Sequence, residues 1–498
     1  MKRYKKLIIL GAILLAAIIA VVVITQINVY KEKIDSTVET IITIDPDEVT
    51  SLSWNYGEEG LSFHKDSESE DESDDALWLY DEDSEFPVDA SKISELLSPF
   101  EEFETEFTIE DVEDYAQYGL DEPMCTVTIV NGDETLEVKF GNYSTMDEER
   151  YVSIGDGKVY LASVDPTENF DIELKDMIKN DEIPSLTDPS DISFAGSENY
   201  SIYRDESGKL SCCLDDVYFR DEEGETQAFD TDYVENLLSE IEGLDEGEYV
   251  TYNATDEEIS KYGLDSPDLT TTVTYVSESE DSDDEEEAEK TYSTFEISFS
   301  KSDEVTEEKE TTTSEEETDS EEADSEEEEE SEYDAYVRIG DSKIIYKISS
   351  SDYEALTAVS YDDLRHTNVY TAGTEQMEGV DVTLNGEDYS FVLGKSKDED
   401  SEDEDAFFYN DEEIDFSDFE TYLEALVVNE FTDEEPEKDE EISLKIKLSN
   451  DNFPEVDIEL YTYDGTNCLA VLDGKTLGLV SRASVVSLIE SVNELVLN

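Results

Sequence analysis

Histidine and positive charge are scarce in this sequence of 498 residues. His64 and His366 are the only histidines and lie in unrelated contexts, which argues against a histidine-based triad and against a zinc site built from several histidines. Lysine and arginine total 31 against 138 acidic residues, for a formal charge of -107. Because nucleic-acid binding needs clustered basic side chains, we expect no nucleic-acid partner.

Cysteine is also rare, with four residues that form no CxxC pair. Four scattered cysteines are too few for a disulfide scaffold, and their number leaves the disulfide state open. Each lies in a half-apolar, strand-like context, so we interpret all four as small buried residues. They are Cys125, Cys212, Cys213 and Cys468.

Phosphate-binding and calcium-binding motifs are missing as well. The 22 glycines include no Walker A sequence and no GxGxxG that opens a helix, and no stretch has the spacing of a calcium-binding loop. Carboxylates are so numerous that no catalytic pair can be singled out. We therefore predict no catalytic, cofactor-binding or metal-binding residues, and only a loose attraction of divalent cations to the acidic tracts.

One long apolar run lies at the N-terminus. Residues 7–24 contain no charged side chain, and the basic residues among positions 1–6 precede them. Eighteen apolar residues are close to the shortest stretch that spans a membrane, and basic flanks stay in the cytoplasm. We predict a transmembrane helix over 7–25, with the remainder outside. A cleaved signal peptide is the alternative, but its apolar region is usually shorter and no clear cleavage site follows.

The main positive feature is an internal repeat. The element Tyr-Gly-Leu-Asp-x-Pro occurs at 118–123 and again at 262–267, about 140 residues further on. Each copy is followed by alternating strand-like segments that end alike, as Tyr-Val-Ser-Ile-Gly-Asp at 151–156 and Tyr-Val-Arg-Ile-Gly-Asp at 336–341. Repetition on this scale indicates several copies of one small domain.

An amphipathic helix indicates a third copy. In each copy an aspartate is followed by apolar residues four, seven, eight and eleven positions later, which places them on one helical face. In the first copy this aspartate, Asp89, is placed to cap the helix. These residues are Asp89, Ile93, Leu96, Leu97 and Phe100, then Asp230, Val234, Leu237, Leu238 and Ile241, and then Asp415, Phe419, Tyr422, Leu423 and Leu426. We predict repeats over 38–184, 185–368 and, more divergent, 369–498.

The Tyr-Gly-Leu-Asp-x-Pro element has a structural interpretation that we favour over an active site. A threonine caps a short helix, the glycine ends it in the left-handed conformation, the leucine packs, and the proline stops the helix resuming. Nothing in the sequence requires a ligand for Asp121 or Asp265. The residues in the structural roles are Thr108, Asp111, Gly119, Leu120 and Pro123 in the first copy and Thr255, Glu258, Gly263, Leu264 and Pro267 in the second.

The second copy carries two long acidic inserts, at 277–290 and 300–332, where the first copy has short connections. Residues 302–332 contain 18 acidic residues and one lysine, too little apolar surface to offset the entropy of ordering. We predict that both inserts are disordered.

The assembled motifs resemble a bacterial domain family of unknown function, DUF4340. The resemblance is carried by Trp78, the helix after Asp89, the two elements at 118–123 and 262–267, and the Tyr-Val strands, and it covers most of residues 40–370. It implies a membrane-anchored protein with its domains outside, and an association with ABC-type transport or gliding-motility-like systems. The family carries no established catalytic residues, so the resemblance transfers none.

We therefore expect an α+β protein of tandem antiparallel meander domains with short helices behind one transmembrane helix. The function that we predict is non-catalytic: an extracytoplasmic accessory or binding protein of the cell envelope, with a protein or envelope polymer as partner. One alternative is an accessory subunit of an ABC-type transport or gliding-motility-like system. Another is an enzyme that uses paired carboxylates on an envelope polymer.

Overall fold

The computed structural model describes residues 38–497 apart from 67–77, 147, 246–247, 280–289, 306–332 and 397–404. The chain divides into two compact units, Met1–Asp181 with Thr251–Asn253, and Glu182–Val250 with Ala254–Asn498. The predicted basic end at 1–6 and transmembrane helix at 7–25 lie outside the described residues. Within the described part of the chain, no helix is both long enough and apolar enough to cross a membrane.

The first unit contains a nine-stranded antiparallel sheet. Its hairpin pairs Trp54 with Leu61, as the alternating sequence predicts. Facing residues such as Val127 and Val138 pair across the central strands and are buried. The strands are β1 Glu39–Ile42, β2 Val49–Tyr56, β3 Glu59–Lys65, β4 Trp78–Tyr80, β5 Phe103–Ile109, β6 Cys125–Asn131, β7 Glu134–Ser144, β8 Glu149–Ser153 and β9 Val159–Ala162.

The second unit contains two further nine-stranded sheets. The strands of one are β10 Asp191–Gly196, β11 Tyr200–Arg204, β12 Tyr218–Glu222, β13 Glu225–Ala228, β14 Glu248–Thr251, β15 Leu269–Ser279, β16 Lys290–Val305, β17 Tyr333–Ile339 and β18 Ile345–Ile348. Those of the other are β19 Met377–Leu384, β20 Glu387–Lys395, β21 Asp405–Tyr409, β22 Glu412–Ile414, β23 Val428–Phe431, β24 Glu440–Leu448, β25 Glu455–Thr462, β26 Asn467–Leu472 and β27 Lys475–Ser481.

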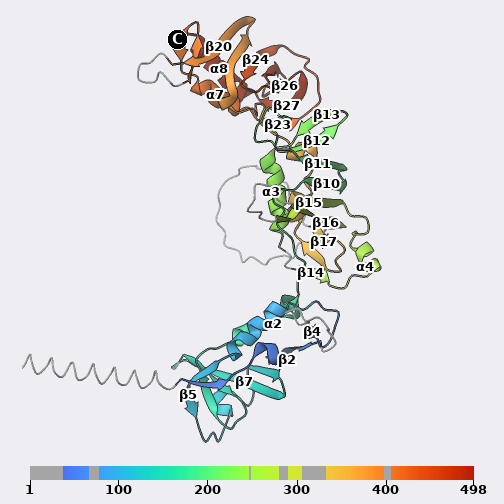
Figure 1. Ribbon diagram of the computed structural model, residues 1–498, viewed down its shortest axis with the longest axis vertical. Helices are drawn as coiled ribbons and strands as arrows, with labels where there is room; N and C mark the ends of the chain where they lie inside the picture. Colours follow the sequence, from blue (N-terminus) through green and yellow to red (C-terminus); the bar gives the residue numbers. More distant parts are fainter. Residues whose placement is uncertain are drawn as a thin grey trace, which may run out of the picture. The chain divides into compact units, whose positions relative to one another are not determined.

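The three sheets share one strand order. Eight neighbours run β4-β3-β2-β6-β7-β8-β9-β5 in the first sheet, β12-β11-β10-β15-β16-β17-β18-β14 in the second and β21-β20-β19-β24-β25-β26-β27-β23 in the third. Figure 1 labels several strands of each sheet. The ninth strand differs, because β1 lies beside β5 whereas β13 and β22 lie at the opposite edge. The predicted antiparallel repeat with short helices is thus confirmed, and the third copy keeps the plan despite its divergent sequence.

The predicted amphipathic helices form in all three copies, as α2 Ala90–Leu97, α3 Thr231–Glu242 and α7 Ser417–Glu424. Asp89 and Asp230 cap the first two by accepting backbone N–H bonds from the second residue beyond. The predicted apolar faces are buried, with one exception. Tyr422 is 39% exposed, since a tyrosine at the margin of the buried stripe keeps its hydroxyl in water.

The Tyr-Gly-Leu-Asp-x-Pro element has the predicted left-handed glycine in both copies, although one detail of the prediction was wrong. In the second copy Thr255 and Glu258 form a capping box on α4 Asp256–Lys261, and Gly263 follows at φ 75°. In the first copy Gly119 has φ 72° and ends only a 3₁₀ turn, Ala116–Tyr118. Thr108 caps nothing there, because it pairs with Tyr160 as part of β5.

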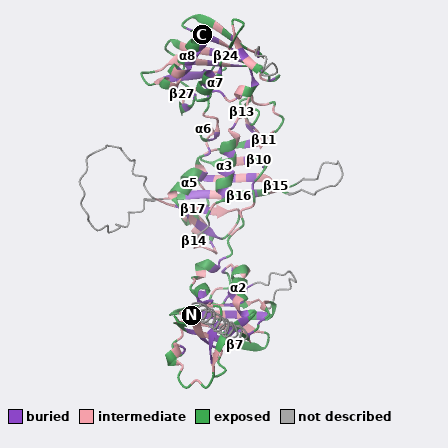
Figure 2. Cartoon of the chain, turned by 90° about the vertical axis from the view of Figure 1, so that its left-hand side faces the viewer, coloured by how far each residue is buried: buried purple, intermediate pink, exposed green. Residues whose placement is uncertain are grey.

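Buried residues follow the strands and the inward sides of the helices (Figure 2). The third copy adds a C-terminal helix, α8 Arg482–Leu497, which packs on the same core as α7 and the sheet. This helix was not predicted from the sequence. The remaining short helices are α5 Ser350–Thr357, α6 Tyr361–Leu364, and the 3₁₀ turns Pro46–Glu48, Ser98–Phe100, Thr167–Phe170, Leu174–Met177 and Thr374–Gln376.

Both predicted inserts begin later than expected. Strand β15 continues to Ser279, which pairs with Lys290, and β16 continues to Val305, which pairs with Tyr333. Strand pairing extends into these acidic ends because the ladder bonds use backbone groups whatever the side chains are. The central parts of both inserts, 280–289 and 306–332, lie outside the described residues.

Candidate functional site

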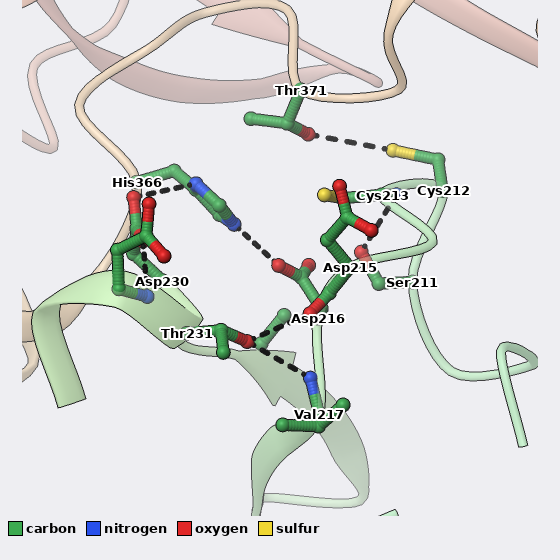
Figure 3. Close-up of polar contacts among 12 residues, drawn as sticks. Ser211, Cys212, Cys213, Asp215, Asp216, Val217, Asp230, Thr231, His366 and Thr371 are labelled. Atoms are coloured by element: carbon green, nitrogen blue, oxygen red, sulfur yellow. Dashed lines mark hydrogen bonds and ion pairs between the residues drawn. The ribbon is translucent and has the colours of Figure 1, made fainter. Parts of the chain in front are cut away.

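A cysteine, an aspartate and a histidine meet in the second unit (Figure 3). Cys213 and Asp216 lie in the connection between β11 and β12, and His366 follows α6 on the segment that leads to the third sheet. Single ligand atoms of the three side chains all lie within 4.8 Å of one another. Asp216 is 2% exposed, and the other two residues are partly buried.

The loop that carries Cys213 and Asp216 is tied to the start of α3. The hydroxyl of Thr231 donates to the carbonyl of Asp215 at 2.9 Å and accepts from the backbone N–H of Val217 at 3.1 Å. These two bonds hold the loop on both sides of Asp216. The backbone on either side of Asp216 is therefore held in place, which limits where the Asp216 carboxylate can lie.

His366 is held between two carboxylates. Its Nε2 lies 2.7 Å from Asp216 Oδ1, and its Nδ1 lies 3.0 Å from Asp230 Oδ2. Asp230 uses its two carboxylate oxygens for different contacts. Oδ1 caps α3 by accepting from the N–H of Asp232, while Oδ2 pairs with Nδ1 of the imidazole. The backbone N–H of Asp230 also donates to the carbonyl of Leu364, which brings the histidine segment against the helix start.

The two carboxylates favour the protonated imidazole. Burial by itself would lower the pKa of His366, but the bonds to Asp216 and Asp230 raise it to about 9. Burial by itself would raise the pKa of Asp230, yet the bond and charge of His366 bring it below the usual value. A pKa above neutral favours the imidazolium form of His366, which then bridges the two carboxylates near neutral pH.

Cys213 is not prepared for nucleophilic attack. Burial, and then the charge of Asp216, raise the pKa of its thiol to about 12. A nucleophilic cysteine needs a lowered pKa or a free histidine nitrogen as base, but Nε2 of His366 already donates its hydrogen bond to Asp216. The arrangement therefore suits ion pairing or metal ligation better than thiol catalysis.

The other side of the same loop contacts the third copy. Cys212 Sγ lies 3.6 Å from Thr371 Oγ1, and the side-chain amide of Gln376 donates to the Cys212 carbonyl at 3.0 Å. Gln376 is itself buried and accepts a bond from Asn450. Within the second unit, the loop thus links the His366 cluster to the core of the third sheet.

The expectation for the cysteines was half right. Cys125 and Cys468 are buried in strands β6 and β26, whereas Cys212 and Cys213 are partly buried in a loop. All four are free thiols. Apolar neighbours suggested that Cys212 and Cys213 are buried. The two residues lie in a loop, however, and a loop can leave such side chains partly exposed.

The residues of the repeat motif do not join the cluster. Asp121 and Asp265, the acidic residues of the two motif elements, are exposed, whereas their neighbours Leu120 and Leu264 are buried. The other histidine, His64, forms an exposed pair with Asp81 in the first unit. The cluster therefore belongs to the second copy and is no part of the repeated plan.

One sequence signal for the cluster was missed. The connection after the second hairpin strand is an acidic tract in the first copy, at 65–75, and in the third, at 395–405. In the second copy the equivalent connection, between β11 and β12, carries Cys-Cys-Leu-Asp-Asp instead. This change of chemistry at one position of the repeat distinguishes the loop from its counterparts in the other two copies.

Residues 78–267 match the sequence model of a domain of unknown function (DUF4340), so this part of the chain contains a DUF4340 domain. The match begins at β4 and ends at Pro267, a shorter stretch than the expected 40–370. It includes Cys213, Asp216 and Asp230 but not His366. No curated protein and no solved structure matches the chain.

Proposed function

We propose that this chain is a non-catalytic accessory protein of the bacterial cell envelope, anchored through residues 7–25, which binds another protein or an envelope polymer outside the cytoplasm. The observation that carries the proposal is the reuse of one strand order in three sheets. Gly119 and Gly263 recur for conformational reasons, and the recurring acids Asp121 and Asp265 face solvent. A repeated scaffold without a repeated reactive group suits binding better than catalysis.

The charge of the chain defines the chemistry of the partner. With 138 acidic residues against 31 basic ones, the long-range field attracts a basic surface and repels anionic polymers and membranes. We therefore expect the bound face of the partner to be rich in lysine and arginine. Association should weaken as salt is added, because exposed charges are screened within about 10 Å at 0.1 M ionic strength.

The test is crosslinking in the cell of origin, followed by gentle solubilisation and mass spectrometry. We expect a basic partner crosslinked to residues of the sheets, at a yield that falls in high salt. A transport ATPase or permease in that position would favour the role of a transport subunit. An isolated chain that degrades an envelope polymer, and loses this activity when single Asp or Glu residues are replaced, would overturn the non-catalytic proposal.

A further inference from the structure

The geometry points to a binding site for a borderline transition-metal dication such as Zn²⁺, with Cys213, Asp216 and His366 as its ligands and Asp230 as the orienting partner of the histidine. All of these residues lie in the second copy, and the inference does not depend on the proposed envelope role. Four kinds of observation support it: the donor set, an unpaired carboxylate oxygen, the contacts of the histidine and the attachment of the loop.

The donor set selects the class of metal. One thiolate sulfur, one imidazole nitrogen and one carboxylate oxygen form a mixed set that suits Zn²⁺ and its first-row neighbours. Ca²⁺ and Mg²⁺ require oxygen ligands and would leave Cys213 and His366 unused. Three protein ligands around a tetrahedral ion leave a fourth position open for water or for a group of a partner.

An unpaired oxygen lies inside the cluster. Asp216 uses Oδ1 for His366, but its buried Oδ2 has no hydrogen-bond partner among the described residues. A buried polar atom without a hydrogen bond is unfavourable, and more so when it is charged. A carboxylate oxygen of Asp216 also lies within 4.8 Å of the Cys213 sulfur. A cation bound to both groups would satisfy the carboxylate.

His366 has the arrangement of a metal ligand with an outer partner. Histidine ligands usually donate their second ring N–H to a carboxylate, which fixes the tautomer and the ring orientation. Nδ1 of His366 makes this contact with Asp230, and Nε2 is directed toward Asp216 (Figure 3). The N-terminus of α3 fixes Asp230 in turn, because its other oxygen caps the helix.

The required rearrangement is small. In a tetrahedral zinc site neighbouring ligand atoms are separated by roughly 3.3–3.8 Å. Nε2 of His366 and Oδ1 of Asp216 are 2.7 Å apart and must separate slightly, while the full set, within 4.8 Å, must contract. Binding replaces the His366 Nε2 proton and the Cys213 thiol proton by the ion, and both protons go to solvent.

The site would connect two repeats. The cluster joins the β11–β12 loop to the segment that leads into the third sheet, and Cys212 of this loop contacts Thr371. A bound ion would therefore fasten the junction between the second and third copies. Since a ligand that binds only the folded state adds stability, metal should protect this junction from opening.

The test uses the full chain in detergent, made metal-free with a chelator and kept reduced with a non-thiol reductant. Co²⁺ is added and its thiolate charge-transfer absorption is recorded, because the many surface carboxylates cannot produce this band. We expect saturation at one equivalent and loss of the band when Zn²⁺ is added. Binding without the thiolate band would show loose association with carboxylates and would overturn the site.

Matched variants assign the ligands. Cys213→Ser should abolish the charge-transfer band, whereas the control Cys212→Ser should keep it. Asp230→Asn still caps α3 and should weaken metal affinity about 10–100-fold, as loss of an outer-shell carboxylate does. Circular dichroism checks that each variant is folded. A band that survives in Cys213→Ser, or disappears only in Cys212→Ser, would contradict the assignment.

Discussion

Gly263 adopts a conformation that side chains resist, and its counterpart Gly119 does the same. Gly263 has φ 75°, and a Cβ added there would meet the Ser300 side chain at 3.3 Å. Leu264, the next residue, is buried and donates its N–H to the Ile259 carbonyl. The glycine thus ends α4 and directs the leucine into the core, which gives a conformational reason for its recurrence.

Gly263→Val should destabilise the second copy by about 1–2 kcal/mol, because a β-branched residue must bear the left-handed conformation. Asp265→Asn should cost much less, since that side chain is exposed. The loss of stability can be measured by native-state hydrogen exchange of peptides from β15 to β18. Both tryptophans, Trp54 and Trp78, lie in the first sheet, so their fluorescence is an internal control that should not change. If Asp265→Asn were folded but lost its partner, the element would be a binding site.

The pKa of His366 predicts a pH dependence for the metal-free protein. The folded value of about 9 exceeds the ordinary 6.5, so the added stability is complete below pH 6.5 and is lost as pH rises through 9. The amount is on the order of 2 kcal/mol for a partly buried group. Melting curves of wild type and His366→Gln, with chelator present, should converge between pH 6 and pH 10. Parallel curves would contradict the doubly paired imidazolium.

The cluster around His366 shows what a local pattern cannot reveal. Asp216 and His366 are 150 positions apart, and their meeting depends on how the second sheet returns to the start of α3. The capping role of Asp230, by contrast, follows from its spacing to the apolar face alone. The capping role of Asp230, which depends on nearby residues, was therefore predictable. Its pairing with His366, which depends on the tertiary fold, was not.

Among the elements, those with strong periodicity were predictable. Helices α2 and α3 combine a capping aspartate with a full apolar face, and both formed as expected. Helix α8 has a comparable apolar face, formed by Val485, Leu488, Val492 and Leu495. It was not predicted because the other two copies have no matching helix with which to compare it. Thr108 failed as a cap because strand pairing with β9 competes for the same residues. Tertiary pairing decides such cases, and local propensity does not.

The connection between β16 and β17 should tolerate shortening. Val305 pairs with Tyr333, so the two residues that flank 306–332 are already side by side, and loop-closure entropy changes only slowly with length. Replacing 306–332 by a short Gly/Ser turn should leave the melting temperature nearly unchanged or raise it, because like charges are removed. A loss of several kcal/mol would show that the acidic segment packs on the sheet, contrary to its composition.

The whole chain combines a strongly acidic body with a short basic end. Residues 1–6 contain four of the 31 basic side chains, directly before the apolar run, while the formal charge of the complete chain is -107. Basic flanks stay in the cytoplasm, and a negatively charged inner leaflet would repel an acidic body on that side. Both effects favour the same orientation, with the sheets outside.

Protease added to intact cells stripped of their wall should therefore digest the chain beyond about Thr25 and leave only a small membrane-protected fragment. Detergent-permeabilised cells, in which every orientation is accessible, are the control. A cytoplasmic marker protein should survive in the intact cells and disappear in the permeabilised ones. Full protection of the chain in intact cells would contradict the orientation. Release of a soluble form that lacks residues 1–24 would instead show that the apolar run is a cleaved signal peptide, because an uncleaved helix of this length holds the sheets at the membrane.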